Sequence, residues 1–203
     1  MSNNAVTIII SAPSGTGKTS ICRSIFRQFP DVRFSVSYTT RPPRAGEVDG
    51  RDYHFVTEAV FRQKMQNGEF AEWAENYGHL YGTSRQMIEE IRSRGEDLIL
   101  DVEPRGARAL KELYRDGIFV FVLPPDLEEL KRRLQKRGAE KDEILRRRFQ
   151  KAKDEIMEVF WYDYIIVNDR LESAVEKLRA IYLAEGCRRE RQRHVIDGFI
   201  KEA

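Results

Sequence analysis

The chain has 203 residues, of which 41% are hydrophobic and 10% aromatic, so it can bury one substantial core and should fold as a single soluble globular domain. Its 35 basic residues nearly balance 33 acidic ones, and the basic runs lack a zinc-finger, basic-zipper or RNA-binding signature, which argues against nucleic acid as a partner. The sequence has two cysteines and three histidines, no apolar run of membrane-spanning length and no signal-type N-terminus. It therefore predicts a cytoplasmic protein without disulfides, zinc or membrane insertion.

The N-terminal region predicts a buried strand followed by a phosphate-binding loop. Val6 to Ile10 is a short apolar, β-branched run, and the loop after it has the phosphate-loop pattern with alanine in place of the first glycine. Its glycines let the backbone approach phosphate oxygens, and its N–H groups and the following helix N-terminus supply positive potential. Lys18 is expected to reach the β- and γ-phosphates of ATP. The loop residues predicted to bind ATP are Ala12, Pro13, Ser14, Gly15, Thr16, Gly17, Lys18 and Thr19.

Residues 34–95 differ in character from the rest of the chain. Phe34 to Ser37 and Tyr53 to Val56 alternate in polarity, Pro42-Pro43 interrupts them, and Phe70 to Tyr81 is polar and rich in aromatic residues. This pattern predicts an inserted antiparallel subdomain.

Three later apolar runs, at residues 98–102, 118–123 and 164–167, predict further strands of a parallel sheet that is buried on both faces. Helical patterns separate them, so the sequence predicts an α/β fold with a three-layer core. Asp101 lies at the end of one such strand. Together with the Thr19 hydroxyl, it is the predicted metal-binding pair for Mg²⁺.

Residues 126–159 predict two amphipathic helices with a hinge near Gly138. Asp126 is the expected N-cap of the first helix, and the second starts near Asp142, with a buried stripe from Leu145 to Val159. Glu172 to Glu185 predicts another helix. The remainder is a basic tail at 187–203, whose arginine run from Arg188 is expected to form a solvated helix extension.

Motifs along almost the whole chain resemble the guanylate kinase family in their order and spacing. They are Thr39-Thr40-Arg41-Pro42-Pro43-Arg44-Ala45-Gly46-Glu47, Gly50-Arg51-Asp52-Tyr53-His54-Phe55, Phe70-Ala71-Glu72-Trp73-Ala74, Tyr81-Gly82-Thr83, Leu100-Asp101-Val102-Glu103, Arg137-Gly138 and Ile166-Val167-Asn168-Asp169. The resemblance implies Mg²⁺-dependent transfer of the ATP γ-phosphoryl group to GMP, and to dGMP, giving ADP and GDP in purine nucleotide metabolism. It implies a core at 1–33, 96–125 and 160–186, a GMP-binding insertion at 34–95 and a helical lid at 126–159.

The resemblance also implies roles for individual residues. The GMP phosphate would be held by two arginines and two tyrosines, whose forks and phenols suit a dianion, and Glu47 counts among the substrate-binding residues. Guanine would be read by a serine, a threonine and two carboxylates, because a carboxylate accepts from the adjacent N1–H and 2-amino groups that adenine lacks. Thr83 stands where serine is frequent, and Glu103 where aspartate is frequent. These implied contacts are Arg41, Arg44, Tyr53 and Tyr81 for phosphate, and Ser37, Glu72, Thr83 and Glu103 for guanine.

The implied catalytic residues are cations around the transferring phosphoryl group. They are Lys18, Arg41 and the lid arginines Arg133, Arg137 and Arg148; Asn168 would contact the adenine side, and Arg146 and Arg147 are expected to be surface charge. Direct in-line transfer requires no protein nucleophile and no general base, because the acceptor oxygen is already anionic.

Two alternatives stay open at this point. One is a related phosphate-loop kinase with a sugar-phosphate acceptor, and the other is a non-catalytic guanylate-kinase-like module that holds phosphorylated peptides. The guanine-facing Ser37 and Glu72 count against the first, and the retained Lys18 and lid arginines count against the second. The sequence leaves a homo-oligomer open.

Overall fold

A computed structural model of the chain describes residues 5–136 and 142–202, and its core is a five-stranded parallel sheet. The sheet order is β2-β7-β1-β8-β9, and every pair of neighbours is parallel. The strands are β1 (Thr7–Ser11), β2 (Arg33–Phe34), β7 (Leu98–Val102), β8 (Ile118–Leu123) and β9 (Tyr164–Val167). The predicted parallel α/β sheet is therefore confirmed.

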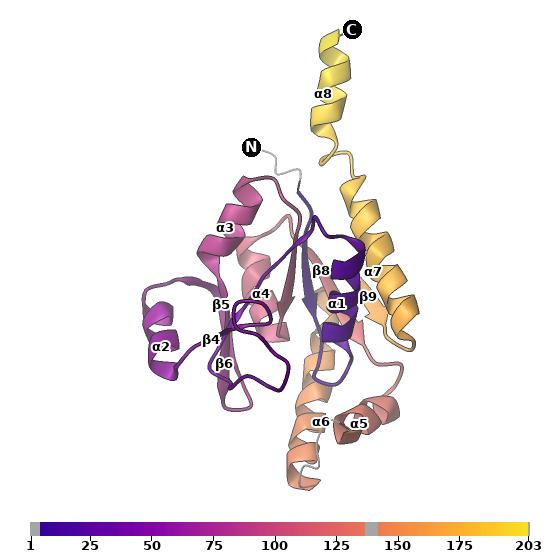
Figure 1. Cartoon of the computed structure of the whole chain (residues 1–203). Helices are drawn as coiled ribbons and strands as arrows, with labels where there is room; N and C mark the ends of the chain where they lie inside the picture. Colours follow the sequence, from indigo (N-terminus) through magenta and orange to yellow (C-terminus); the bar gives the residue numbers. More distant parts are fainter. Residues whose placement is uncertain (1–4, 137–141, 203) are drawn as a thin grey trace.

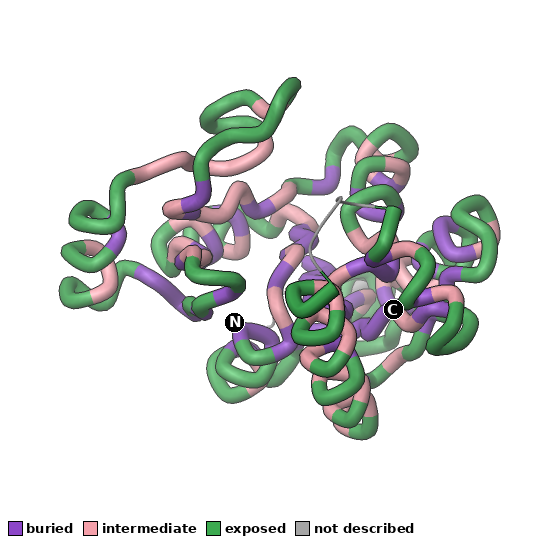
Figure 2. The backbone as a smooth tube through the Cα atoms, turned by 90° about the horizontal axis from the view of Figure 1, so that it is seen from below, coloured by how far each residue is buried: buried purple, intermediate pink, exposed green. Residues whose placement is uncertain are grey.

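Helices cover both faces of this sheet because successive strand residues point to opposite sides. On one side, Ile8 and Ile10 of β1 pack with apolar residues of α1 (Lys18–Gln28) and α7 (Leu171–Gly186). On the other side, Ile9 packs with residues of α3 (Arg85–Ser93) and α4 (Pro104–Leu113). Three layers result (Figure 1). The central strands β1, β7 and β8 are almost entirely buried, and the outer turns of the chain are exposed (Figure 2).

The segment between β2 and α3 forms a second sheet of order β4-β3-β6-β5 (Figure 1). Its elements are β3 (Tyr38–Thr39), β4 (His54–Phe55), α2 (Glu58–Gln66), β5 (Phe70–Asn76) and β6 (His79–Ser84). The prediction of antiparallel pairing is right for β3–β6 and β5–β6 but wrong for β3–β4, which is parallel. The long loop between β3 and β4 permits this, since parallel neighbours need a crossover longer than a hairpin turn.

The start of the predicted insertion also differs from expectation. Arg33 and Phe34 pair with Leu98 and Ile99, so Phe34 belongs to the core sheet. The alternating run from Phe34 therefore does not form a strand of the second sheet.

Two helices follow β8, as predicted. In α5 (Leu127–Lys136), the Asp126 carboxylate caps the N-terminus by accepting from Glu129 N–H at 2.7 Å. In α6 (Asp142–Ile156), the predicted stripe packs on α5, but Val159 lies in the 3-10 helix η1 (Met157–Trp161) and packs on the main core instead. The predicted hinge at Gly138 lies outside the described residues.

The C-terminal segment ends in α8 (Arg193–Glu202), which stands away from the rest of the molecule (Figure 1). The prediction of a solvated helix extension from Arg188 is wrong in two respects: residues 187–192 are not helical, and Arg191 is only 8% exposed. Its guanidinium donates to the carbonyls of Ala5 at 2.6 Å and Asp116 at 3.2 Å, so it ties the segment after α7 to the core. Within residues 5–136 and 142–202, no helix is long and apolar enough to cross a membrane.

Candidate active site

The predicted phosphate-binding loop lies between β1 and α1, at the carboxyl end of the central strand. Gly15 has φ 95° and Gly17 has φ 93°, a left-handed conformation that glycine adopts without steric cost. Ala12 is not in this conformation, since Tyr77 is the one described non-glycine residue with positive φ. The alanine in place of the first glycine is thus compatible with the loop.

Lys18, the first residue of α1, lies against the end of β7. Its Nζ forms an ion pair with Asp101 Oδ1 at 2.6 Å and donates to the Val102 carbonyl at 2.6 Å. Burial alone would lower the pKa of Lys18, but the carboxylates of Asp101 and Glu103 outweigh it and raise the pKa above its ordinary value. A permanently charged ammonium therefore stands where the loop begins its helix.

The residues predicted for Mg²⁺ have suitable chemistry. Thr19 follows Lys18 in α1 and is exposed, and Asp101 pairs in register with Ile10, directly before the loop. Mg²⁺ is usually held by one or two protein oxygens together with phosphates and waters, so a hydroxyl and a carboxylate at this point fit the ion.

Both helices of the predicted lid contact the loop. Arg133 of α5 donates to the carbonyls of Thr16 at 3.2 Å and Asn168 at 3.0 Å, and Glu129 accepts from its Nε at 2.6 Å. Arg132 also donates to the Glu129 carboxylate at 2.6 Å, and the hydrogen bonds from the two arginines lower the pKa of Glu129 to about 2. The helix α5 also packs on the loop: a Cβ at Gly15 would lie only 3.0 Å from the Leu134 side chain.

Arg148 of α6 donates to the Ser14 hydroxyl at 3.0 Å. Arg147 pairs with Glu143 at 2.8 Å on an exposed face and Arg146 is exposed, so their prediction as surface charge is confirmed. Arg137 lies outside the described residues.

Asn168 braces the loop from the end of β9. Its side-chain amide donates to the Thr16 carbonyl at 2.6 Å, and a Cβ at Gly17 would lie 2.5 Å from the same nitrogen. The glycine at position 17 is therefore required by this close approach as well as by its φ.

Three of the four predicted guanine contacts come together between β3, β5 and β6, while Glu103 stands at the N-terminus of α4 and acts on Glu72 through its charge. Thr83 donates to Glu72 Oε1 at 2.5 Å, and the Ser37 hydroxyl lies 3.5 Å from that of Thr83. Glu72 is 7% exposed. Burial, with the Glu103 charge adding to it, raises the pKa of Glu72 to about 7, although the Thr83 bond opposes the shift.

The predicted phosphate contacts lie on and beside the loop between β3 and β4. Arg41 is 9% exposed; it donates to Glu47 Oε1 at 2.9 Å, and its guanidinium lies 5.4 Å from the centre of the Tyr53 ring. The rings of Tyr53 and Tyr81 lie 6.1 Å apart, and burial raises the pKa of Tyr53 to about 12. Three of the four predicted phosphate contacts are therefore brought together.

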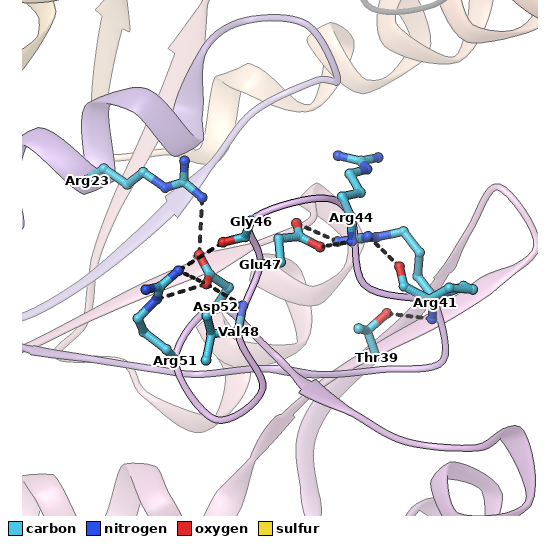
Figure 3. A network of polar contacts seen from close by, with 10 residues as sticks. Arg23, Thr39, Arg41, Arg44, Gly46, Glu47, Val48, Arg51 and Asp52 are labelled. Atoms are coloured by element: carbon cyan, nitrogen blue, oxygen red, sulfur yellow. Dashed lines mark hydrogen bonds and ion pairs between the residues drawn. The ribbon is translucent and has the colours of Figure 1, made fainter.

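Arg44 differs from these three. Its backbone N–H donates to Glu47 Oε2 at 2.7 Å, while its side chain extends away from the loop (Figure 3). Glu47 is thus an organiser of the loop, since it accepts from both arginines. A second network around Asp52 fastens the loop, through Arg51 at 2.7 Å, and connects it to Arg23 of α1 at 3.1 Å (Figure 3).

Sequence reasoning missed a contact between α6 and the tip of the β5–β6 hairpin. The Tyr77 ring lies 5.3 Å from the Arg148 guanidinium and 4.9 Å from Lys151 Nζ, and Lys151 also donates to Asn76 Oδ1 at 2.5 Å. The available signal was Tyr77-Gly78 at a tight turn, where asparagine or glycine is usual in place of tyrosine.

Comparison with known proteins agrees with this geometry. The family model described as guanylate kinase matches residues 4–185. The chain belongs to the guanylate kinase family. It is 56% identical to a guanylate kinase of Syntrophus aciditrophicus (strain SB) over 95% of this chain and 93% of that one. It is 54% identical to a guanylate kinase of Geobacter metallireducens, covering 93% of each chain.

A solved structure of a family member supports the fold. The crystal structure of guanylate kinase from Anaplasma phagocytophilum matches with a TM-score of 0.77 and 31% identity, covering 92% of this chain and 89% of that chain. The α/β architecture of the described residues is thus that of the family.

Proposed function

We propose that this protein transfers the γ-phosphoryl group of ATP to GMP, giving ADP and GDP. Family membership supports the phosphoryl-transfer activity. The hydrogen bond between Thr83 and the buried Glu72 carboxylate is the observation that supports GMP as the acceptor. A carboxylate buried to this extent would be costly without a partner that satisfies its remaining acceptor positions. The adjacent N1–H and 2-amino groups of guanine are such a partner, whereas adenine would present an acceptor at N1.

The remaining acceptor contacts follow from the polar loop between β3 and β4. Arg41, pre-oriented by Glu47, and the phenols of Tyr53 and Tyr81 would bind the GMP phosphate, and Arg44 would turn inward to join them. Ser37 would add a polar contact to the base, with Glu103 as a second carboxylate.

On the donor side, the loop from Ala12 to Thr19 would hold the ATP phosphates, with Asn168 beside the adenine. Lys18 would move from the Val102 carbonyl to the β- and γ-phosphates. When bound, Mg²⁺ would neutralise phosphate charge, and Thr19 and Asp101 are the residues that would hold it.

Transfer in this site depends on positioning and charge. The GMP phosphate is largely dianionic at neutral pH, because the second pKa of a phosphate monoester is about 6, so its oxygen needs no general base. Lys18, Arg41, Arg133, Arg137 and Arg148 would stabilise charge on the transferring group, and arginine contacts of this kind contribute roughly 10³ to 10⁵ in rate. We assign residues 34–95 to the acceptor subdomain and 126–159 to a lid that excludes water.

Two further assignments extend this proposal. dGMP is expected to be accepted, because none of the proposed guanine and phosphate contacts involves the ribose 2′-hydroxyl.

We place the protein in the cytoplasm, consistent with its two free cysteines, Cys22 and Cys187.

Product analysis distinguishes transfer from hydrolysis and from binding alone. Protein is mixed with ATP, GMP and Mg²⁺, and the nucleotides are separated after a short incubation. Equal amounts of ADP and GDP, with no ADP when GMP is omitted, support the proposal. ADP with free phosphate and no GDP would identify a hydrolase, and no ADP at all would leave the binding module as the better account.

A further inference from the structure

Gly106 is a glycine that its own backbone does not require. It is the third residue of α4, its φ is not positive, and it is buried against the second sheet. Alanine is preferred over glycine inside helices, because glycine loses more conformational freedom on folding. The reason for a glycine must therefore lie in what packs against it.

The Glu72 carboxylate is what packs there. A Cβ at position 106 would lie 2.7 Å from Glu72 Cδ and 3.3 Å from Cγ, and closer still to Oε2. The two residues meet because α4 packs against β5, the strand that carries Glu72. Cβ atoms do not approach other heavy atoms this closely, so an alanine would force the carboxylate to move.

The carboxylate has little room to move. Its other oxygen, Oε1, is held by Thr83, which is fully buried and donates to it, and Glu72 and Thr83 are paired across β5 and β6. A displacement large enough to clear the added Cβ would stretch or break this bond, and breaking it would leave a buried acceptor with one partner fewer.

We infer that Gly106 is a positioning residue for guanine recognition: the missing side chain forms a seat that, with Thr83, fixes the direction of the Glu72 carboxylate. The inference rests on the proposed function, because it assumes that this carboxylate faces guanine. The two hydrogen bonds from the carboxylate to adjacent donors of guanine tolerate little error in direction. The seat therefore sets the affinity for GMP, although Gly106 itself does not contact GMP.

Gly106→Ala in the full-length chain tests the kinetic part. The KM for GMP should rise roughly 30- to 100-fold with a smaller change in kcat, since a displaced carboxylate loses charged hydrogen bonds of the acceptor complex. The KM for ATP should stay within about twofold, because the donor loop is separate. Gly198→Ala is the matched control: that glycine also lies in a helix, with no atom within 4 Å of an added Cβ, and parental kinetics are expected.

Thermal melting of four proteins tests the seat itself: the parent, Gly106→Ala, Glu72→Ala and the double variant. Gly106→Ala should lower the Tm of the parent but raise that of Glu72→Ala by about 2 °C, because the clash is gone and the helix preference for alanine remains. The same Tm change in both backgrounds would overturn the seat. Opposite Tm changes with an unaltered KM for GMP would overturn the positioning role.

These failures differ from failure of the proposed function. If the parent formed no GDP, the proposed function would fall, and with it the role in guanine recognition, whatever the melting data gave.

Discussion

At the scale of single residues, Lys18 combines a structural contact with a proposed catalytic one. Replacing it with methionine keeps the alkyl stem but removes the charge that pairs with Asp101 at 2.6 Å. We expect turnover to fall at least about 10³-fold, because a phosphate contact on the transferring group is lost. The Tm should drop by several degrees, since Asp101 loses its partner, while the fold is retained. Turnover within tenfold of the parent would contradict its role as phosphate clamp.

The acidity of Glu72 predicts a pH dependence. Its pKa is raised to about 7 from 4.5, so the ionised form that accepts from guanine is lost as the pH falls below 7. We expect kcat/KM for GMP to fall roughly tenfold per pH unit between pH 6.5 and 5 from this group. The free energy of unfolding changes with pH in the opposite direction. The folded state holds the Glu72 proton more tightly than the unfolded state, so ionisation of Glu72 lowers stability progressively from pH 4.5 to 7.

Two variants isolate this ionisation from that of the GMP phosphate. Glu72→Gln should lower kcat/KM for GMP by about 10² at neutral pH, and its pH profile should lack the fall in kcat/KM that comes from protonation of Glu72. Glu155→Gln should retain that fall, although burial and the Glu103 charge also raise the pKa of Glu155 to about 7. A pH profile that is unchanged in Glu72→Gln would remove Glu72 from acceptor binding.

At the scale of elements, the tip of the β5–β6 hairpin suggests that α6, in the proposed lid, and the second sheet act together. Tyr77 has φ 52°, a conformation that costs a bulky residue of order 1–3 kcal/mol, yet its ring contacts both Arg148 and Lys151 of α6. Tyr77→Asn should raise the Tm, because asparagine tolerates this φ, but lower kcat roughly tenfold through two lost cation–π contacts. Tyr77→Phe keeps the ring and should keep kcat. Equal kcat in all three proteins would show that the contact has no part in catalysis.

Prediction of elements from the sequence succeeded where hydrophobic periodicity decides the structure. The apolar runs from Leu98, Ile118 and Tyr164 are strands of the parallel sheet, and Asp126 caps α5. The parallel β3–β4 pairing could not be predicted, because two-residue strands have almost no periodic signal and their pairing depends on the path of a long loop.

The candidate site was predictable where a motif carries its own chemistry. The loop around Lys18 lies between a strand and a helix, as expected. The structure also brings together Ser37, Glu72 and Thr83, as expected. Gly106 and Tyr77 were not predictable, since their importance depends on which side chains from distant segments pack against them.

At the scale of the whole molecule, Arg191 ties the segment after α7 to both the start of β1 and the turn before β8. Arg191→Ala removes two hydrogen bonds from a buried guanidinium, worth about 2 kcal/mol, and should lower the Tm by roughly 4–8 °C with kinetics unchanged.

Two truncations separate this anchor from α8. Ending the chain after Gln192 removes α8 alone and should leave both Tm and turnover at parental values, whereas ending it after Gly186 should reproduce the Tm loss of Arg191→Ala. Loss of GMP phosphorylation by a folded protein ending at Gln192 would show that α8 completes the site.

In the proposed function, one molecule joins an ATP site to an acceptor site that recognises guanine. A coupled assay of ADP release across GMP, dGMP, AMP, CMP and UMP tests it most directly. We expect turnover with GMP and dGMP, and a kcat/KM at least about 10³-fold lower with AMP, because adenine would set an acceptor against the Glu72 carboxylate. Equal use of AMP and GMP, or ADP release that is independent of any acceptor, would contradict it.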